Sequence, residues 1–177
     1  QRQMCIRDSS KEEKKLIGNV FHIFNGTSIG LTEGPFLFKR NNWYYLITAE
    51  GGTEYNHSVT VARSRNIKGP YEVHPSNPIL TSSDNPNLYL QKAGHGSIVS
   101  TQDGRWYLAH LVGRPLSPRG RCTLGRETAL QEIIWKEDEW MYIKGGGHSP
   151  YNSIEAPNLK EQLWNDSQFY HDFNEEN

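Results

Sequence analysis

Two stretches of this chain follow the same pattern of apolar, aromatic and turn-forming residues, and this internal repeat constrains the fold most. The stretch EGPFLFKRNNWYYLITA begins at Glu33 and HGSIVSTQDGRWYLAHL begins at His95, a spacing of about 62 residues. The aromatic pairs that start at Trp43 and Trp106 align with one residue of slippage in the turn. Each stretch is followed by a second, less regular hairpin pattern. Four strands at this period are typical of one blade of a β-propeller.

The repeat predicts an all-β chain. Turn residues support this prediction, because Asn41–Asn42 and Gln102–Gly104 each separate two runs rich in β-branched and aromatic residues. A short helix over Lys11–Leu16 is the one helical segment that we consider. Two repeats cannot close a ring of blades, so we expect about two to three blades of a larger propeller. A β-sandwich with a coincidental likeness between hairpins is the alternative.

Composition excludes several classes of function. The formal net charge of the 177 residues is −1, which provides no basic field for nucleic acid and no polybasic patch for a membrane surface. No apolar run approaches the roughly 20 residues that span a bilayer. The two cysteines, Cys5 and Cys122, do not predict a disulfide framework. We therefore expect neither nucleic acid nor a membrane as a partner.

Three segments are expected along the chain. Residues 1–10, QRQMCIRDSS, have no signal-peptide layout and no periodicity, and we interpret them as a non-native scar that leaves the true N-terminus and the localisation unknown. Residues 11–144 are expected to form the C-terminal blades of a propeller. Residues 145–177 are rich in Gly, Pro, Asn and Ser, which is typical of a linker toward a further domain.

Glu33 is the main candidate for chemistry. The Gly34–Pro35 pair fixes the backbone on one side of Glu33, so the carboxyl group is expected to have a defined direction. An apolar surrounding from Phe36, Trp43 and Tyr44 would favour the protonated form that a general acid needs. A solvated turn carboxylate is the ordinary alternative. The first strand of a propeller blade lines the central channel, which would bring Glu33 and its repeat equivalent to one cavity.

Other polar side chains are expected around the same channel. His95 lies between glycines and is a candidate for holding water or a metal, although no zinc-ligand spacing is present. A calcium ion held mostly by water would leave little signature in the sequence. Thr53 and His57 are candidates for contacts with a ligand hydroxyl, or are ordinary turn residues. Arg126 can fork onto hydroxyls or a carboxylate, or form a surface ion pair.

The acids near these residues have subordinate expected roles. Glu127 is expected to hold its neighbour Arg126 in place. Glu50 and Glu54 are expected on the rim of the channel, without a direct role in proton transfer. No G-x-S-x-G elbow is present, which argues against a serine nucleophile.

Taken together, the motifs resemble those of glycoside hydrolase family 43. The segments GLTEGPFLFK, YYLITAEGGTEYNHSVTVARSRNIKGPYEVHPSNPILTS, QKAGHGSIVSTQDGRWYLAHLVGRPL and CTLGRETALQ carry the resemblance, which covers about residues 17–173. They are most similar to two-domain β-xylosidases and α-L-arabinofuranosidases. The resemblance implies a five-bladed propeller that is followed by a C-terminal β-sandwich, and an inverting mechanism.

The resemblance also implies roles for individual residues. Glu33 in TEGP resembles the general acid, His95 in GHG resembles the histidine of a central metal or water site, and Arg126 in GRETA resembles the arginine that binds the terminal sugar. Ser97 stands where family members often carry Asp. No residue matches the family's base Asp or its pKa-tuning Asp, so the full-length parent is expected to be the enzyme and this chain an inactive fragment.

The resulting hypothesis is an exo-acting glycosidase that hydrolyses xylo-oligosaccharides, arabinofuranosides or both. A non-catalytic glycan-binding propeller is the alternative from another class, and an interaction scaffold is disfavoured. The sequence does not separate xylosidase from arabinofuranosidase. It also leaves the oligomeric state of the parent open, a homo-oligomer included.

Overall fold

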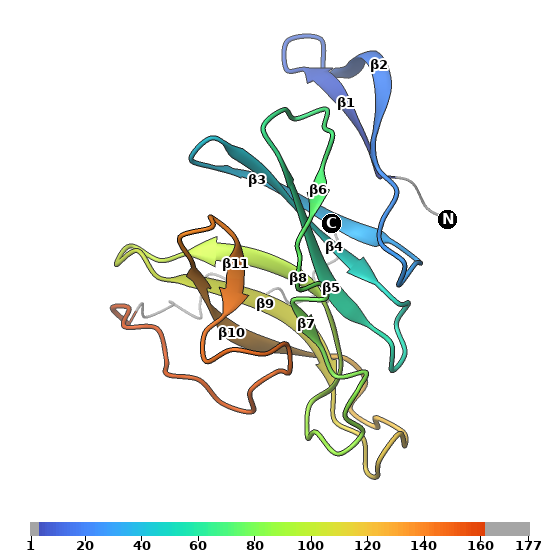
Figure 1. Ribbon diagram of the computed structural model, residues 1–177, viewed down its shortest axis with the longest axis vertical. Helices are drawn as coiled ribbons and strands as arrows, with labels where there is room; N and C mark the ends of the chain where they lie inside the picture. The colour runs from blue at the N-terminus through green and yellow to red at the C-terminus, as the bar shows by residue number, and fades with distance from the viewer. Residues whose placement is uncertain (1–3, 162–177) are drawn as a thin grey trace, which may run out of the picture.

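The computed structural model describes residues 4–161, which contain β-strands and no α-helix. Two antiparallel sheets form most of the molecule, and a separate hairpin stands at the N-terminal end (Figure 1). None of the described residues forms a helix that could cross a membrane. The strands are β1 (Met4–Ser10), β2 (Lys15–Phe24), β3 (Glu33–Arg40), β4 (Trp43–Glu50), β5 (Ser58–Ser64), β6 (Glu72–Val73), β7 (Leu80–Thr81), β8 (Gln91–Ser100), β9 (Trp106–Gly113), β10 (Glu127–Trp135) and β11 (Met141–Ile143).

The two sheets have the same topology, which confirms the repeat. In the first sheet the order is β3-β4-β5-β6, with β7 paired to β5, and in the second it is β8-β9-β10-β11. Each is a meander of four consecutive antiparallel strands, as in a propeller blade. The expected turns also form, because Arg40 pairs with Trp43 across two residues, and Asn41 has a φ of 52°. The chain is all-β, with two blades described.

The first hairpin of each repeat is irregular near its candidate site residue, and β8–β9 has a second register shift, between Gln91 and Gly94. The β3–β4 register shifts between Glu33 and Phe36, and the β8–β9 register shifts between Gly94 and Ser97. Such a bulge redirects the side chains beside it. A bulge of this kind therefore occurs at the TEGP motif and at the GHG motif.

The first sheet is buried on both faces. Tyr45 and Ile47 of β4 belong to the core between the two sheets, where β8 packs against β4 and β5. Leu46 faces the other way and packs with Ile23 and Phe24 of the N-terminal hairpin. Because successive side chains of a strand point to opposite faces, this double burial explains the nearly continuous apolar run of β4.

The ends of the sheets that lie away from the TEGP motif are joined by aromatic rings. Tyr45 and Trp135 make an edge contact with ring centroids 4.9 Å apart. The turn between β10 and β11 closes this junction, because Glu139 accepts a hydrogen bond from Trp43 Nε1 at 2.7 Å. Arg63 reaches the same turn and donates to the backbone oxygen of Asp138 at 2.7 Å. These contacts fix the second blade against the first.

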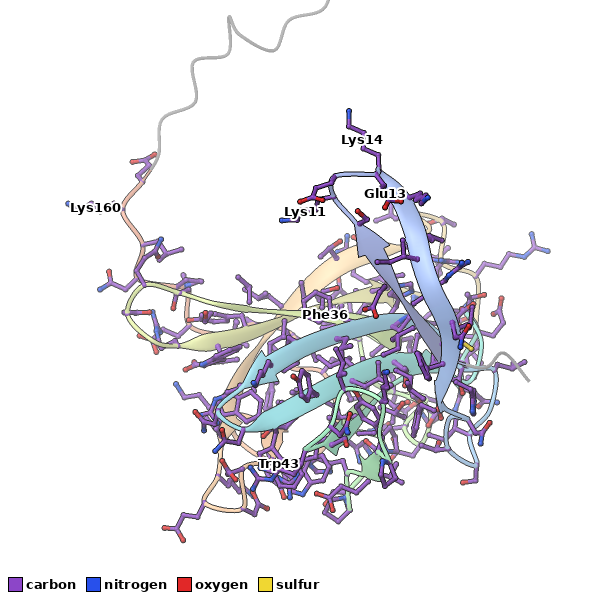
Figure 2. All side chains as sticks on the ribbon, turned by 90° about the horizontal axis from the view of Figure 1, so that it is seen from above. Lys11, Glu13, Lys14, Phe36, Trp43 and Lys160 are labelled. Atoms are coloured by element: carbon purple, nitrogen blue, oxygen red, sulfur yellow. The ribbon has the colours of Figure 1, made fainter. Side chains whose placement is uncertain are left out.

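The N-terminal segment differs from expectation in conformation. Lys11–Lys14 form a turn and β2 begins at Lys15, so the short helix predicted over Lys11–Leu16 is wrong. Residues 4–10, which we set aside as a scar, pair with β2, and Met4 is buried. This pairing concerns their conformation and not their origin. Figure 2 shows the tip of the hairpin, at Lys11, Glu13 and Lys14, projecting away from the sheets.

The C-terminal segment has no regular structure as far as it is described. After β11, residues 144–161 contain neither helix nor strand. The remainder of the predicted linker, from residue 162 to 177, lies outside the described residues.

Candidate active site

His95 lies against Gly34, the residue that follows Glu33, although 61 residues separate Glu33 and His95 in the sequence. Gly34, the residue after Glu33, has a φ of +55°, and a Cβ atom there would lie 2.6 Å from His95 Nε2. The imidazole therefore packs directly on the Gly34 backbone. Glycine is required at this position both for the left-handed backbone and for the close approach. The repeat thus brings His95 onto the residue that follows Glu33, whereas a cavity shared by the two residues stays a prediction.

The surroundings predicted for Glu33 are wrong in one respect. Glu33 pairs with Ala49, whereas Trp43 pairs with Arg40 at the far end of the same hairpin. With a rise of about 3.3 Å per residue, the length of the strands separates Trp43 and Tyr44 from the carboxyl group. Glu33 itself is half-buried. Trp43 serves the junction between the sheets, and the centroid of the Tyr44 ring lies 5.2 Å from Lys39 Nζ.

His57 forms the centre of the site. Its side chain is 2% exposed, and its Nδ1 atom lies 3.2 Å from the backbone oxygen of Lys92. Gly94 makes room for this ring, because a Cβ there would overlap the imidazole. Within the described part of the chain, Nε2 is buried and has no hydrogen-bond partner. A buried donor or acceptor of this kind is available to a ligand or a water molecule.

The electrostatics of His57 place the other candidates around it. Burial lowers the pKa of His57, and the charges of His95 and Arg126 lower it further, while the charge of Glu33 acts in the opposite direction. Such interactions need short separations, because Coulomb energies fall with distance and are screened by solvent. Glu33, His57, His95 and Arg126 therefore belong to one neighbourhood.

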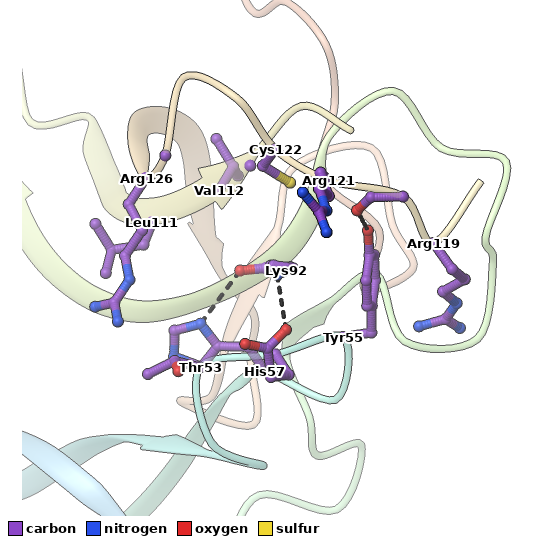
Figure 3. Close-up of a pocket in the computed structure, with 14 residues that line it drawn as sticks. Thr53, Tyr55, His57, Lys92, Leu111, Val112, Arg119, Arg121, Cys122 and Arg126 are labelled. Carbon is purple, nitrogen blue, oxygen red and sulfur yellow. Dashed lines mark hydrogen bonds and ion pairs between the residues drawn. The ribbon is translucent and has the colours of Figure 1, made fainter. Parts of the chain in front are cut away.

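A cavity of about 590 Å³ opens beside His57 (Figure 3). Thr53, His57 and Arg126, the three residues predicted to bind substrate, all line it. Its size lies within the range of about 300–1,000 Å³ that is common for small-molecule sites. Glu33 and His95 are not among its lining residues, but adjoin it through His57.

The partner predicted for Arg126 is wrong. Glu127 binds Arg114 with both carboxylate oxygens, at 2.8 and 2.6 Å, and Arg114 also donates to the Tyr89 hydroxyl at 2.8 Å. Arg114 follows β9 directly and Glu127 begins β10. This bidentate pair therefore joins the two ends of the loop over residues 114–126, and it positions Arg126 through the backbone.

Glu50 is more important for the site than the sequence suggested. It is fully buried and accepts hydrogen bonds from the Thr27 backbone nitrogen at 2.8 Å and from Thr32 Oγ1 at 3.0 Å, as well as from the Thr27 hydroxyl. These bonds anchor the loop that ends at Glu33. Glu54 pairs instead with Lys92 at 2.7 Å and remains on the rim. The sequence placed Glu50 on the rim of the channel, and only the tertiary contacts identify it as a buried acid.

A metal site built from side chains is absent from the described residues. No group of three or more histidine, cysteine, aspartate or glutamate side chains among them could hold an ion. Calcium takes six to eight oxygen ligands, whereas His95 offers an imidazole nitrogen that packs on Gly34. The described residues therefore do not fit a calcium ion that is held by the protein, and the ion held mostly by water stays a prediction.

Known proteins are similar to this chain in sequence and in fold. The model of the glycosyl hydrolases family 43 matches residues 1–141. The xylosidase/arabinosidase 43B of Humicola insolens is 62% identical over 143 residues, which are 81% of this chain and 27% of that protein. The beta-xylosidase of Bacillus subtilis is 53% identical over 169 residues, which are 91% of this chain and 31% of that protein.

Solved structures agree with the fold. The xylan beta-1,4-xylosidase from Bacillus halodurans C-125 superposes with a TM-score of 0.85 at 55% identity, covering 89% of this chain and 30% of that one. The chain thus spans about a third or less of the relatives that it matches, and its two blades correspond to a part of their propeller. With a family match over most of its length and an identity of 62% to a curated relative, this chain belongs to glycoside hydrolase family 43.

Proposed function

We propose that the protein containing this chain is an inverting exo-glycosidase that removes xylose, arabinofuranose or both from hemicellulose oligosaccharides. One observation carries the proposal. The charge of Glu33 acts on His57, and His95 packs on the residue after Glu33, beside a cavity that Thr53 and Arg126 line. The related proteins named as xylosidases and arabinosidases support this substrate class.

In this proposal Glu33 is the general acid. It protonates the glycosidic oxygen as the bond to the terminal sugar breaks, because a sugar alkoxide is a poor leaving group. Arg126 binds sugar hydroxyls through its guanidinium fork, and Thr53 and His57 provide further polar contacts. His95 packs against the backbone of Gly34, the residue after the acid, and helps to hold the acid in place, with or without a bound water.

The general base lies outside this chain in the proposal. Inversion needs a second carboxylate roughly 6.5–9.5 Å from the acid, with a water between them. Glu50 is occupied by the two threonines of the loop before Glu33, and Glu54 is bonded to Lys92. Neither is suited to activate water. We therefore expect the base and the acid-modulating aspartate on blades beyond these residues, and no turnover by the 177-residue chain alone.

Substitution of Glu33 in the full-length protein tests the proposal. Glu33→Ala should cripple hydrolysis of xylobiose and of an arabinofuranosyl-xylo-oligosaccharide, whose leaving groups need a proton. Nitrophenyl xyloside and nitrophenyl arabinofuranoside leave more easily, so their loss of kcat should be smaller. The gap between the substrate types should approach the 10²–10⁴-fold that general acid catalysis typically supplies.

Glu54→Ala is the matched control, because Glu54 is an exposed carboxylate on the same rim. Any loss of kcat in Glu54→Ala should be the same for natural and nitrophenyl substrates. Equal losses on both substrate types in Glu33→Ala would mean that Glu33 positions the sugar and does not donate a proton. Sugar binding without hydrolysis by the full-length protein would favour the glycan-binding propeller. The ratio of the two nitrophenyl activities identifies the preferred sugar.

A further inference from the structure

The loop over residues 114–126, RPLSPRGRCTLGR, carries four arginines and no acidic residue. Three of them, Arg119, Arg121 and Arg126, line the cavity beside His57, together with Lys92 (Figure 3). The only carboxylate among the residues that line this cavity is Glu54, which is already bonded to Lys92 at 2.7 Å. The cavity therefore has a marked excess of positive charge, although the whole chain is nearly neutral.

The arginine-bearing loop is held in one conformation. Its ends are joined by the Arg114–Glu127 pair, and its middle is fixed by a hydrogen bond from the Tyr55 hydroxyl to the Gly120 backbone oxygen at 2.6 Å. Cys122 packs against Gly113, where a Cβ would lie 2.8 Å from its sulfur. A loop fixed at its ends and at its middle presents its guanidinium groups at low entropic cost to a ligand.

The guanidinium groups that line the cavity lack ion-pair partners among the described acids, although the charge of Arg126 acts on the Glu54 carboxylate. Arg119 donates to the backbone oxygen of Ser83 and lies over the Tyr55 ring, 4.8 Å from its centroid. Within residues 4–161, none of Arg119, Arg121 and Arg126 forms an ion pair with an acidic side chain. Like charges repel when they are gathered at one cavity, and an anionic ligand would relieve this repulsion.

We propose that this cavity binds a carboxylate carried by the substrate, as on an oligosaccharide with a uronic acid substituent next to the sugar that is removed. The planar, forked donors of arginine match a carboxylate in two parallel hydrogen bonds. Neutral sugars require no such excess of cations. The link to catalysis rests on the proposed glycosidase function, whereas the binding of a carboxylate rests on the cavity alone.

Calorimetry on the full-length protein tests the site without any need for turnover. Glucuronate and glucose serve as probes because they have the same ring and differ by the carboxylate. The wild-type protein should bind glucuronate at least about fivefold more tightly than glucose at low salt, and the difference should shrink in about 0.5 M salt. Inorganic phosphate is the third probe. Equal affinities for glucuronate and glucose, or tighter binding of phosphate than of glucuronate, would overturn the proposal.

Two variants and one control locate the effect. Arg121→Gln removes an exposed arginine of the cavity, and Arg119→Gln removes a second one by a different position on the loop. Each should reduce the preference for glucuronate by about three- to tenfold. Arg65→Gln makes the same chemical change at an exposed arginine outside the cavity, and it should leave the preference unchanged. An unchanged preference in both cavity variants would contradict the assignment.

Kinetics distinguish this proposal from the proposed function. The ratio of kcat/KM for a uronate-substituted xylotriose to that for plain xylotriose should fall in Arg121→Gln, and not in Arg65→Gln. A protein that prefers glucuronate but hydrolyses neither oligosaccharide would refute the glycosidase and keep the carboxylate site. A protein that hydrolyses both, with the same ratio in all variants and no preference for glucuronate, would keep the glycosidase and refute the site.

Discussion

A methyl group on Gly34 would disturb the contact that joins the two halves of the site. Its Cβ would lie 2.6 Å from Nε2 and 2.8 Å from Cε1 of His95, well inside van der Waals contact. A left-handed backbone costs a residue with a Cβ about 1–2 kcal/mol, and overpacking typically costs about 1–3 kcal/mol. Gly34→Ala should therefore destabilise the protein by about 2–5 kcal/mol.

Urea unfolding of the full-length protein measures this effect against two references. Gly104 also has a positive φ, of +81°, but no atom of the described residues lies within 4 Å of the position that an added Cβ would take, so Gly104→Ala should show the backbone cost alone. Gly34→Ala combined with His95→Ala should cost less than the sum of the single substitutions, since the imidazole is then absent. Equal losses for the two glycine variants, or simple additivity with His95→Ala, would refute the packing of His95 on Gly34.

Two further predictions concern the buried His110 and the Arg114–Glu127 pair. Burial lowers the pKa of His110 to about 4 from an ordinary value of 6.5, so between these pH values the His110 side chain stays neutral in the folded protein and is protonated in the unfolded chain. The stabilisation present above pH 6.5 should therefore be lost, by up to about 3 kcal/mol, as the pH falls toward 4. His110→Gln should reduce the difference in unfolding free energy between about pH 7 and about pH 4.5, whereas the control His148→Gln, at an exposed side chain, should not. Glu127→Gln should raise KM several-fold by loosening the loop that carries Arg126. Adding Arg114→Gln should raise KM little further, because the two residues act as one pair. Additive effects on KM in steady-state kinetics would show that the two residues act independently.

The sequence predicts the fold of this chain well because the fold is repetitive. The likeness between the stretches from Glu33 and His95 reflects two antiparallel hairpins of the same topology, so a single alignment predicts the strands, their turns and the equivalence of the two residues. The contact between Gly34 and His95 follows from that equivalence. The turn predicted at Asn41 is also confirmed, since this residue has the left-handed φ that asparagine tolerates in tight turns.

Contacts between distant strands could not be predicted in this way. Proximity in sequence suggested that Trp43 surrounds Glu33, but the antiparallel register places it at the opposite end of the hairpin. Likewise, proximity suggested that Glu127 holds Arg126, but Glu127 opens β10 and binds Arg114, which follows the neighbouring strand β9. Glu50 is important because it binds a loop at Thr27, 23 residues earlier in the sequence, and the sequence does not show this contact.

The central claim is that Glu33 donates the proton, and the pH dependence of kcat/KM tests it most directly. For an aryl xyloside the full-length wild-type protein should lose activity at high pH, as the acid loses its proton. In Glu33→Ala this basic limb should disappear, while the acidic limb, which reports the base, should remain. A basic limb that persists unchanged in Glu33→Ala would show that another group supplies the proton and would contradict the account.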